Sequence, residues 1–336
     1  MAQLYKIMAD GVDVTAGFSD RMTDMTITDH DGMQADELKV KFDDRDFRLT
    51  PPRKGAILKV WMDDQRGGGL AFMGAFEVKG RSREFDKQTG RVMEVQAKSA
   101  DLRKSIKKPR TGSFKKTTYE GLAQQLASRN GLTAKVSASI ASLKIEFEGQ
   151  SEESDLHMAS RLARDVDAIC KVANGQLIIQ SRDDLDMPPI VLRQSDFIKL
   201  KVSDDDRAQH SKATAHYHNQ GEANRKPETF ESDNDSDSDA PDAPEFMLRH
   251  TFETKERAQA AAKGKMNALQ RQEKSLNGTM SGNTAIMAGL PAIIAWGIEL
   301  YDGEYVFKTV THHMTKAGGM TTMVSSDKGK KKKGGK

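Results

Sequence analysis

The pattern of apolar and polar positions changes character twice along the chain. Residues 1–105 hold short apolar runs that alternate with polar residues and are separated by turn residues, which is typical of β-strands. Leu38, Val40 and Phe42 alternate with lysines, so one face of this strand is expected to be buried. Many short strands at this spacing predict a barrel or a sandwich.

Two amphipathic helices are predicted within residues 117–179. The first is expected to start at a capping box, in which Thr117 and Glu120 bond each other's backbone amides, and to end at Asn130-Gly131. The second is expected to begin after Ser151, where carboxylates in the first turn interact favourably with the helix dipole. The apolar stripes of the two helices are Leu122, Ala123 and Leu126, and Leu156, Ala159, Leu162, Ala163 and Val166. This block is predicted to be a small α/β domain.

Toward the C-terminus the pattern again indicates β structure, interrupted by a polar run and a third helix. The predicted strands are Ile190–Leu192, Phe197–Val202, Ala213–His218, Leu276–Met280, Pro291–Trp296, Glu299–Leu300, Tyr305–His312 and Met320–Val324. Residues 219–245 are rich in carboxylates and nearly devoid of apolar residues, so we expect no regular structure there. Thr254 can cap a helix over residues 254–271, and Asp302-Gly303 is a hairpin signal.

Charge and composition narrow the possible functions. The net charge is +3, but six lysines lie in residues 328–336, and without them it is −3. A nucleic-acid-binding domain would carry its basic surface on the fold itself, so that class is disfavoured. The cation-rich residues 101–116 are expected to form a solvated linker or to contact an acidic neighbour. The N-terminus has no signal-peptide pattern and no window is apolar enough for a membrane helix, so synthesis in a host cytoplasm without membrane insertion is expected.

The one cysteine, Cys170, excludes an internal disulfide framework and lies among apolar residues, which predicts a small core side chain. Two histidine pairs are candidates for metal ligands. His216 and His218 would share one face of a strand, whereas His312 and His313 would point to opposite faces. No further ligands follow at a recognisable spacing, and no phosphate loop or nucleophile elbow occurs. We therefore predict no metal site, no cofactor and no catalytic residue.

An acidic run also resembles the start of a calcium loop. Asp233, Asp235 and Asp237 have the one-three-five spacing, but Ser238 replaces the glycine at position six and Pro244 the glutamate at position twelve. The run is therefore interpreted as an acidic linker.

The lysine tail could be mobile, could bind nucleic acid phosphates, or could contact an acidic partner surface or a neighbouring chain's linker. The predicted partner-contact residues are Lys330, Lys331, Lys332, Lys333, Asp233, Asp235 and Asp237.

The order of elements resembles the phage late control gene D family, the baseplate hub proteins of contractile tails, which are related to the hub part of type VI secretion spike proteins. The resemblance lies in Ser154-Asp155, then Leu162-Ala163-Arg164, then Asn174-Gly175 before a strand at Leu177. It continues in Lys255–Ala268 as a helix, Gly289-Leu290-Pro291 and Val306–Val324, and covers most of residues 1–325.

The resemblance implies an α+β, mainly β fold with two tail-tube-like β-barrel domains and an inserted small α/β domain. The expected domains are residues 1–105 (first barrel), 106–189 (insertion), 190–325 (second barrel, with acidic loop 219–245 and helix 254–271) and 326–336 (lysine-rich tail). As a homotrimer, the protein would adapt a six-fold tail tube to a three-fold spike and form part of the ejection conduit.

The partners implied by the resemblance are the tail spike, the distal tail tube ring, the tape measure protein and baseplate wedge proteins, with DNA only in transit. The expected location is the tail baseplate of a virion. A peptidoglycan-acting or glycan-binding tail module is the alternative function.

Overall fold

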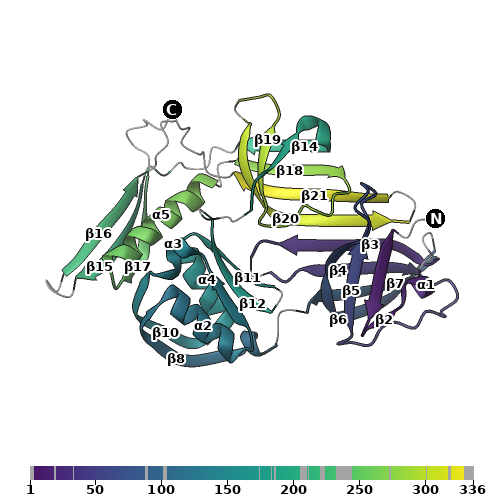
Figure 1. The fold of residues 1–336 in the computed structure, drawn as a ribbon, viewed down its shortest axis with the longest axis horizontal. Coiled ribbons are helices and arrows are strands. Elements are labelled where there is room, and N and C mark those ends of the chain that lie inside the picture. The colour runs from purple at the N-terminus through teal and green to yellow at the C-terminus, as the bar shows by residue number, and fades with distance from the viewer. Residues whose placement is uncertain are drawn as a thin grey trace. The chain divides into compact units, whose positions relative to one another are not determined.

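The computed structural model describes residues 4–328 except 19, 33, 88–89, 101–103, 174, 183, 185–186, 205–209, 211, 220–223, 232–243, 272–273, 300 and 317–318. The chain is mainly β, with 57% strand and 19% helix, which confirms the predicted fold class at that level. It divides into two compact units, each built from segments far apart in sequence (Figure 1). Unit 1 comprises Met1–Leu102, Pro189–Val202 and Leu276–Ser326; unit 2 comprises Arg103–Pro188, Ser203–Ser275 and Asp327–Lys336.

Unit 1 is built on a 13-stranded sheet in the described part of the chain. Its N-terminal strands are β1 (Tyr5–Ala9), β2 (Val12–Asp13), β3 (Met22–His30), β4 (Glu37–Asp43), β5 (Ile57–Met62), β6 (Ala71–Asp86) and β7 (Gly90–Ser99), with helix α1 (Thr15–Phe18). Its C-terminal strands are β13 (Ile190–Arg193), β14 (Phe197–Asp204), β18 (Lys274–Ser281), β19 (Pro291–Ala295), β20 (Gly303–Thr315) and β21 (Gly319–Lys328). The main path is β14-β18-β21-β20-β3-β4-β7-β6-β5-β1-β2.

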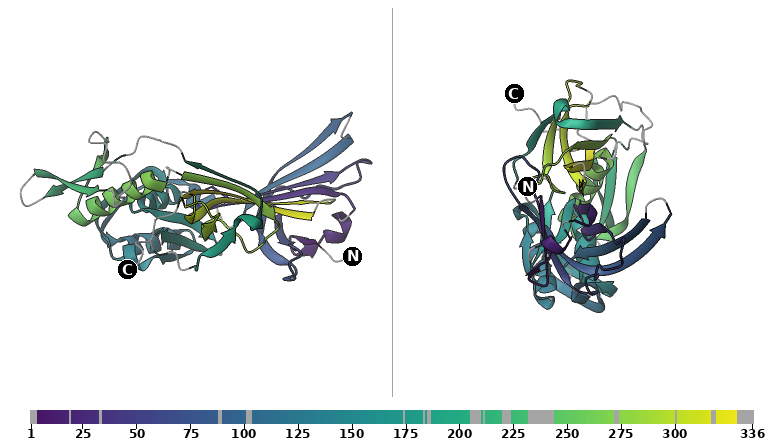
Figure 2. Two further views of the ribbon diagram at one scale, coloured as in Figure 1. Left: turned by 90° about the horizontal axis from the view of Figure 1, so that it is seen from above. Right: turned by 90° about the vertical axis from the view of Figure 1, so that its right-hand side faces the viewer.

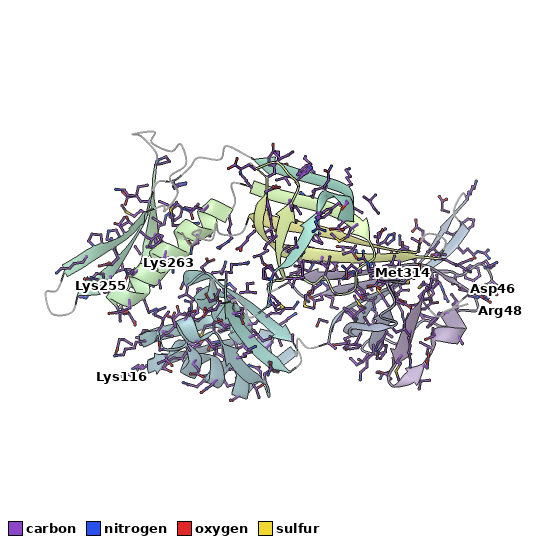
Figure 3. All side chains as sticks on the ribbon, turned by 45° about the horizontal axis from the view of Figure 1, so that its top comes forward. Asp46, Arg48, Lys116, Lys255, Lys263 and Met314 are labelled. Carbon is purple, nitrogen blue, oxygen red and sulfur yellow. The ribbon has the colours of Figure 1, made fainter. Side chains whose placement is uncertain are left out.

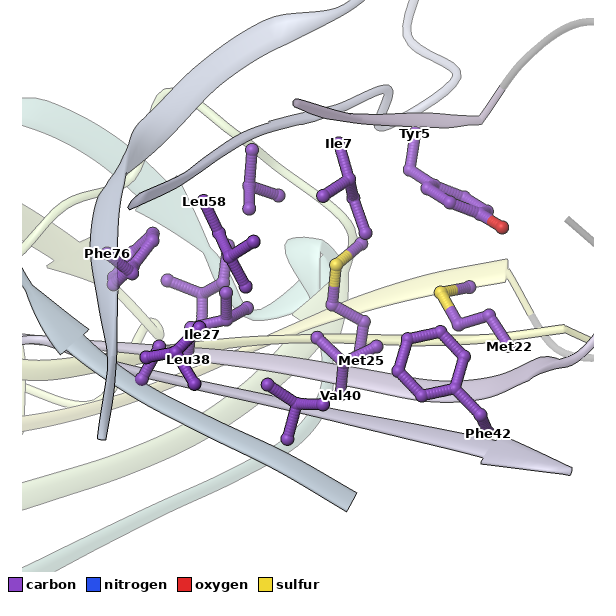
Figure 4. Close-up of a cluster of buried hydrophobic side chains, with 14 of the residues drawn as sticks. Tyr5, Ile7, Met22, Met25, Ile27, Leu38, Val40, Phe42, Leu58 and Phe76 are labelled. Atoms are coloured by element: carbon purple, nitrogen blue, oxygen red, sulfur yellow. The ribbon is translucent and has the colours of Figure 1, made fainter. Parts of the chain in front are cut away.

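Each of the two strand groups of unit 1 has its own hydrophobic core. In the N-terminal group, Leu38, Val40 and Phe42 are at most 2% exposed and the lysines between them face solvent, as the alternation predicts. They pack with Tyr5, Ile7, Met22, Met25, Ile27, Leu58 and Phe76 (Figure 4). The C-terminal group has a separate core that includes Leu276, Ile294, Tyr305, Phe307 and Val310. The sheet therefore joins two modules with separate cores, although Met314 of β20 contributes to the N-terminal one.

The two modules are joined where β20 pairs with β3 in antiparallel register, from Thr309 opposite His30 to Thr315 opposite Asp24. A second contact lies at the β5–β6 loop, where the Asp64 carboxylate accepts hydrogen bonds from the Thr284 amide and hydroxyl at 2.9 and 2.8 Å. These groups lie 220 residues apart in sequence, so only the folded chain brings them together.

Unit 2 combines the predicted α/β block with a second α/β layer. The block contains η1 (Lys104–Lys107), β8 (Pro109–Thr118), α2 (Tyr119–Arg129), β9 (Thr133–Val136), α3 (Ala138–Ala141), β10 (Lys144–Ser154), α4 (Asp155–Asp165), β11 (Ala168–Ala173) and β12 (Gln176–Ser181). The second layer contains β15 (Lys212–Asn219), β16 (Asn224–Glu231), β17 (Glu245–Phe252) and α5 (Lys255–Arg271). Helix α5 lies across the sheet β16-β15-β17 (Figures 1 and 2).

The helix starts in unit 2 differ from the prediction. The N-cap of α2 is Thr118, whose hydroxyl accepts a hydrogen bond from the Gly121 amide at 3.1 Å, so the predicted cap at Thr117 is wrong by one residue. The N-cap of α4 is Ser154, not Ser151. The physical reason is that the β8–β10 ladder runs up to both caps, with Thr118 paired with Lys144 and Ser154 paired with Pro109, so neither helix begins before its cap. The cap of α5 at Thr254 is confirmed by its 3.2 Å bond to the Arg257 amide.

Two segments expected to be irregular contain strands. The cation-rich stretch 101–116 is neither a plain linker nor fully solvated, because much of it belongs to β8, which pairs with β10. The polar run 219–245 contributes β16, which pairs with β15 although it has few apolar residues. Backbone pairing with a partner strand, which local composition does not encode, decides both cases. Conversely, Glu299, expected in a strand, is outside one.

The compact units also divide the chain differently from the expected domain ranges. Residues 203–275, assigned to a second barrel at 190–325, group with the insertion in unit 2. One reason is the close packing of α5 on the turn after α4: a Cβ on Gly264 would lie 3.0 Å from the Asp167 amide nitrogen and 3.2 Å from the Asp165 carbonyl oxygen. A glycine inside a helix therefore marks a close contact with neighbouring backbone that a larger residue would push apart.

Candidate interaction surfaces

The histidines considered as metal ligands do not form a site. Within the described ranges, no group of three or more His, Cys, Asp or Glu side chains is arranged to hold a metal ion. His312 is buried and bonds the Thr322 hydroxyl and the Ile286 carbonyl, both at 3.1 Å. Burial lowers the pKa of His312 and favours its neutral form. His313 instead contacts the Asp24 carboxylate on the neighbouring strand.

Cys170 is 4% exposed on β11, and burial raises the pKa of its thiol to about 11. Because thiolate is the reactive form, a buried thiol of this kind is a core side chain and a poor nucleophile. The prediction that Cys170 belongs to the core is confirmed.

A buried ion network joins the two layers of unit 2. Arg257 on α5 is 3% exposed and its Nη2 lies 3.0 Å from Glu148 Oε2 on β10. Arg161 on α4 donates to the other Glu148 oxygen at 2.8 Å and to Glu153 at 3.0 Å. The guanidinium of Arg257 also lies 5.9 Å from the Tyr119 ring centroid. Each charged side chain in this network has an oppositely charged partner, and the ion pairs hold β10, α4 and α5 together.

The acidic residue of the Ser-Asp pair has a comparable role. Asp155, fully buried at the start of α4, accepts hydrogen bonds from Asn130 at 2.9 Å and Gln150 at 2.8 Å. Arg110 and Arg129 lie 3.3 and 3.6 Å from its oxygens. The carboxylate therefore links β8, α2, β10 and α4. The sequence analysis assigned Asp155 to the helix dipole and to the Ser-Asp pair of the resemblance, but it did not predict this buried linking role.

A cavity of about 390 Å³ lies in unit 2, and its charged lining residues include more cations than carboxylates. The charged lining residues are Arg161, Arg164, Arg182, Lys265, Arg271, Asp165 and Asp167. Arg271 binds Asp167 through two hydrogen bonds, while burial raises the pKa of Asp165. Glycoside hydrolysis develops positive charge in its transition state, which a cationic lining would oppose. The cavity is thus a poor candidate for the glycan-cleaving alternative.

An exposed aromatic group lies at one end of unit 1. Phe47 and Phe85 are 55% and 66% exposed, and the Arg91 Cζ atom lies 4.1 Å from the Phe47 ring centroid and 5.8 Å from that of Phe85. We call these three residues the Phe47 patch. Asp46 and Arg48, which flank Phe47, are labelled in Figure 3. Sequence reasoning missed the patch, although an aromatic residue within the charged run Asp43–Arg48 was a visible signal.

The residues predicted to contact partners lie outside the described part of the chain. They are Asp233, Asp235, Asp237, Lys330, Lys331, Lys332 and Lys333. Their partner contacts therefore stay a prediction. None of the described helices is both long and apolar enough to cross a membrane.

Comparison with known proteins places these features in context. The sequence profile of the family described as phage tail baseplate hub (GPD) matches residues 72–318. The probable baseplate hub proteins of Escherichia phages P2 and 186 are 34% identical over 174 residues and 33% identical over 179 residues. These matches cover 52% and 53% of this chain but only 44% and 45% of the relatives, so the chain matches less than half of their length.

Solved structures share the fold over nearly the whole chain. The 43 kDa tail protein of prophage MuSo2 from Shewanella oneidensis has a TM-score of 0.72 at 14% identity, covering 97% of this chain and 98% of its own. A tail protein from Neisseria meningitidis MC58 has a TM-score of 0.71 at 14% identity, with 97% of each chain covered. The E. coli c3393 protein, a component of the type VI secretion system, has a TM-score of 0.55 at 11% identity, covering 92% of this chain and 73% of its own.

Proposed function

This chain belongs to the phage tail baseplate hub (GPD) family, and on that premise we propose that three copies form an adapter between a six-fold tail tube and a three-fold spike. Proteins of this family are components of the virion tail, so we start from a structural role for this chain. The trimer would line part of the conduit through which DNA passes in transit. Its mechanism would be mechanical and would need no catalytic residue.

The observation that supports this proposal is the construction of unit 1. One chain carries two β modules with separate cores, joined in one sheet through β20 and β3. Each module is proposed to be a tail-tube-like barrel. Three chains would then present six modules, the number that a six-fold ring requires.

The ends of the sheet offer a means of joining one chain to the next. The main path of the sheet ends at β14 and β2. Edge strands present backbone amides and carbonyls that can pair with another chain. Ile198 on β14 is 66% exposed, so this edge also carries apolar surface. The proposed partners are a second and third copy, the spike, the distal tube ring, the tape measure protein and baseplate wedge proteins.

Light scattering on the purified protein, alone and with the spike protein of the same phage, tests the proposal. We expect three 37.1 kDa chains, about 111 kDa, or a monomer that becomes a three-to-three complex with the spike. Electron microscopy of the complex should show six density modules around the axis. A stable monomer that ignores the spike, or a ring of another order, would overturn the adapter role. No described residue gives the glycan-binding alternative specific support.

A further inference from the structure

The Phe47 patch combines exposure with an unusual backbone conformation. Phe47 has a φ of +57°, in the left-handed region that bulky residues rarely adopt. A residue keeps such a conformation only when its surroundings enforce it, and these positions cluster at binding sites. Phe47 is 55% exposed and is absent from the hydrophobic core of its module, so burial in that core does not account for this conformation.

Partly buried hydrogen bonds hold the loop that carries Phe47. The Phe47 amide donates to the Asp44 carbonyl at 3.1 Å, and the Asp44 side chain is 1% exposed. Arg83 on β6 donates to the Asp44 carboxylate and to the Leu49 carbonyl, each at 2.7 Å. The loop is thereby fixed at both ends to the adjacent β hairpin. A fixed loop loses little conformational entropy when it binds.

Ion pairs on the outer side of the loop strengthen this fixation. Arg21 donates two hydrogen bonds to Asp46, at 2.5 and 2.7 Å, and the first of these holds the pKa of Asp46 well below its usual range. Phe85 and Arg91 are paired directly across the β6–β7 ladder, so the second ring and the guanidinium are held by a hairpin. The patch therefore holds the Phe47 and Phe85 rings and the Arg91 guanidinium in a fixed arrangement at the surface.

From this geometry we propose that the Phe47 patch is the centre of a docking site for a different protein of the baseplate. Aromatic residues and arginine dominate the energetic centres of protein interfaces. The proposal names the surface through which the hub would bind another protein and the chemistry of that protein's surface. It depends on the hub role only because its test uses assembled tails.

The charges around the patch define the chemistry of the partner. Arg48 is 82% exposed and 3.9 Å from Asp46, and Arg45 is 66% exposed. The partner surface would place carboxylates against these arginines and an apolar recess against the two rings. The arginines of this region outnumber its carboxylates, so a second copy that docks patch to patch would oppose like charges.

Replacing the two rings tests the proposal. Phe47→Gly removes the ring and relieves the strained conformation, while Phe85→Ser removes the second ring from an exposed strand. The matched control is Phe147→Ser in unit 2, because Phe147 is 49% exposed and has its own cation, with Lys115 Nζ 5.9 Å from the ring. We expect the double variant to lose incorporation into tails about tenfold or more, and the control to be incorporated as wild type.

Two readouts separate docking from a structural role. The melting temperature of Phe47→Gly should equal or exceed that of wild type, because glycine adopts positive φ without strain. In assembled tails, a photoreactive benzoylphenylalanine at position 47 or 85 should crosslink to another protein, at a peptide containing Asp or Glu, and the same group at 147 should not give that product.

Four results would overturn the proposal: normal incorporation of the double variant, a lower melting temperature for Phe47→Gly, no intermolecular crosslink, or crosslinks only to DNA or to a second copy. If the wild type and the Phe147→Ser control also fail to enter tails, the hub role fails and not the patch.

Discussion

Replacing Glu148 by alanine should destabilise unit 2 and leave unit 1 unchanged. Glu148 accepts from Arg257 at 3.0 Å and from Arg161 at 2.8 Å. Arg161 keeps Glu153 after the substitution, whereas Arg257 loses its 3.0 Å partner and keeps Glu253 at 3.9 Å. Because the Arg257 side chain is 3% exposed, the substitution leaves a poorly compensated buried charge.

The expected magnitude follows from that uncompensated charge. Removing one partner of a buried ion pair costs about 3–5 kcal/mol, because the remaining ion keeps its desolvation penalty. Replacing both members by apolar residues removes the penalty as well, so Glu148→Leu with Arg257→Met should recover a large part of the loss. The single and double variants therefore separate an unpaired charge from a simple loss of contacts.

The chain provides separate reporters for the two units. Its two tryptophans, Trp61 and Trp296, both lie in unit 1, so tryptophan fluorescence in a urea titration follows that unit. Hydrogen exchange of peptides from α5, Lys255–Arg271, follows unit 2. For Glu148→Ala we expect exchange in α5 to accelerate about a hundredfold or more, with no shift of the tryptophan transition.

Lys255→Ala serves as the control on the same helix. Lys255 is 58% exposed and lies 3.6 Å from Glu228, and such surface pairs contribute about 1 kcal/mol or less (Figure 3). The reasoning is refuted if Glu148→Ala changes α5 exchange no more than Lys255→Ala does, or if the double variant is less stable than Glu148→Ala alone.

Three further predictions concern single positions. Gly264→Ala should destabilise unit 2 by about 1–3 kcal/mol, because its Cβ would meet the Asp167 backbone at 3.0 Å; unchanged exchange in α5 would contradict this. Cys170, whose pKa is raised to about 11, should resist alkylation by iodoacetamide at pH 8 in the native protein and should react in urea. Mass spectrometry measures the labelling, and rapid labelling of the native protein would contradict the protection by burial. Burial lowers the pKa of His312 in the folded protein. Above pH of about 6.5 the side chain is neutral in both the folded and the unfolded state, and the fold keeps its full stability; this contribution is lost as the pH falls from there toward the pKa of the folded state. Melting of His312→Gln between pH 5 and pH 8 should accordingly depend less on pH than melting of wild type; an unchanged dependence would assign the effect to other groups.

Local patterns in the sequence were enough for most elements. Strict alternation placed Leu38, Val40 and Phe42 in the core, and the spacing of Leu122 and Leu126 gave the buried face of α2. Asn130-Gly131 ends that helix, with Gly131 at a positive φ of 65°. These features depend on neighbours within one or two turns, so a local pattern contains the information needed to predict them.

The tertiary structure alone decided how these elements combine. Pairing of β20 with β3, the grouping of residues 203–275 with the insertion and the burial of Asp155 all depend on contacts between segments distant in sequence. The shifted caps of α2 and α4 have the same origin, since the β8–β10 ladder sets where each helix can begin. The exposed Phe47 is a further case, because its loop is held by hydrogen bonds from Arg83 on β6 to Asp44 and Leu49. Backbone pairing and ion pairing between distant segments carry no local signature, which is the physical reason why the sequence by itself could not reveal them.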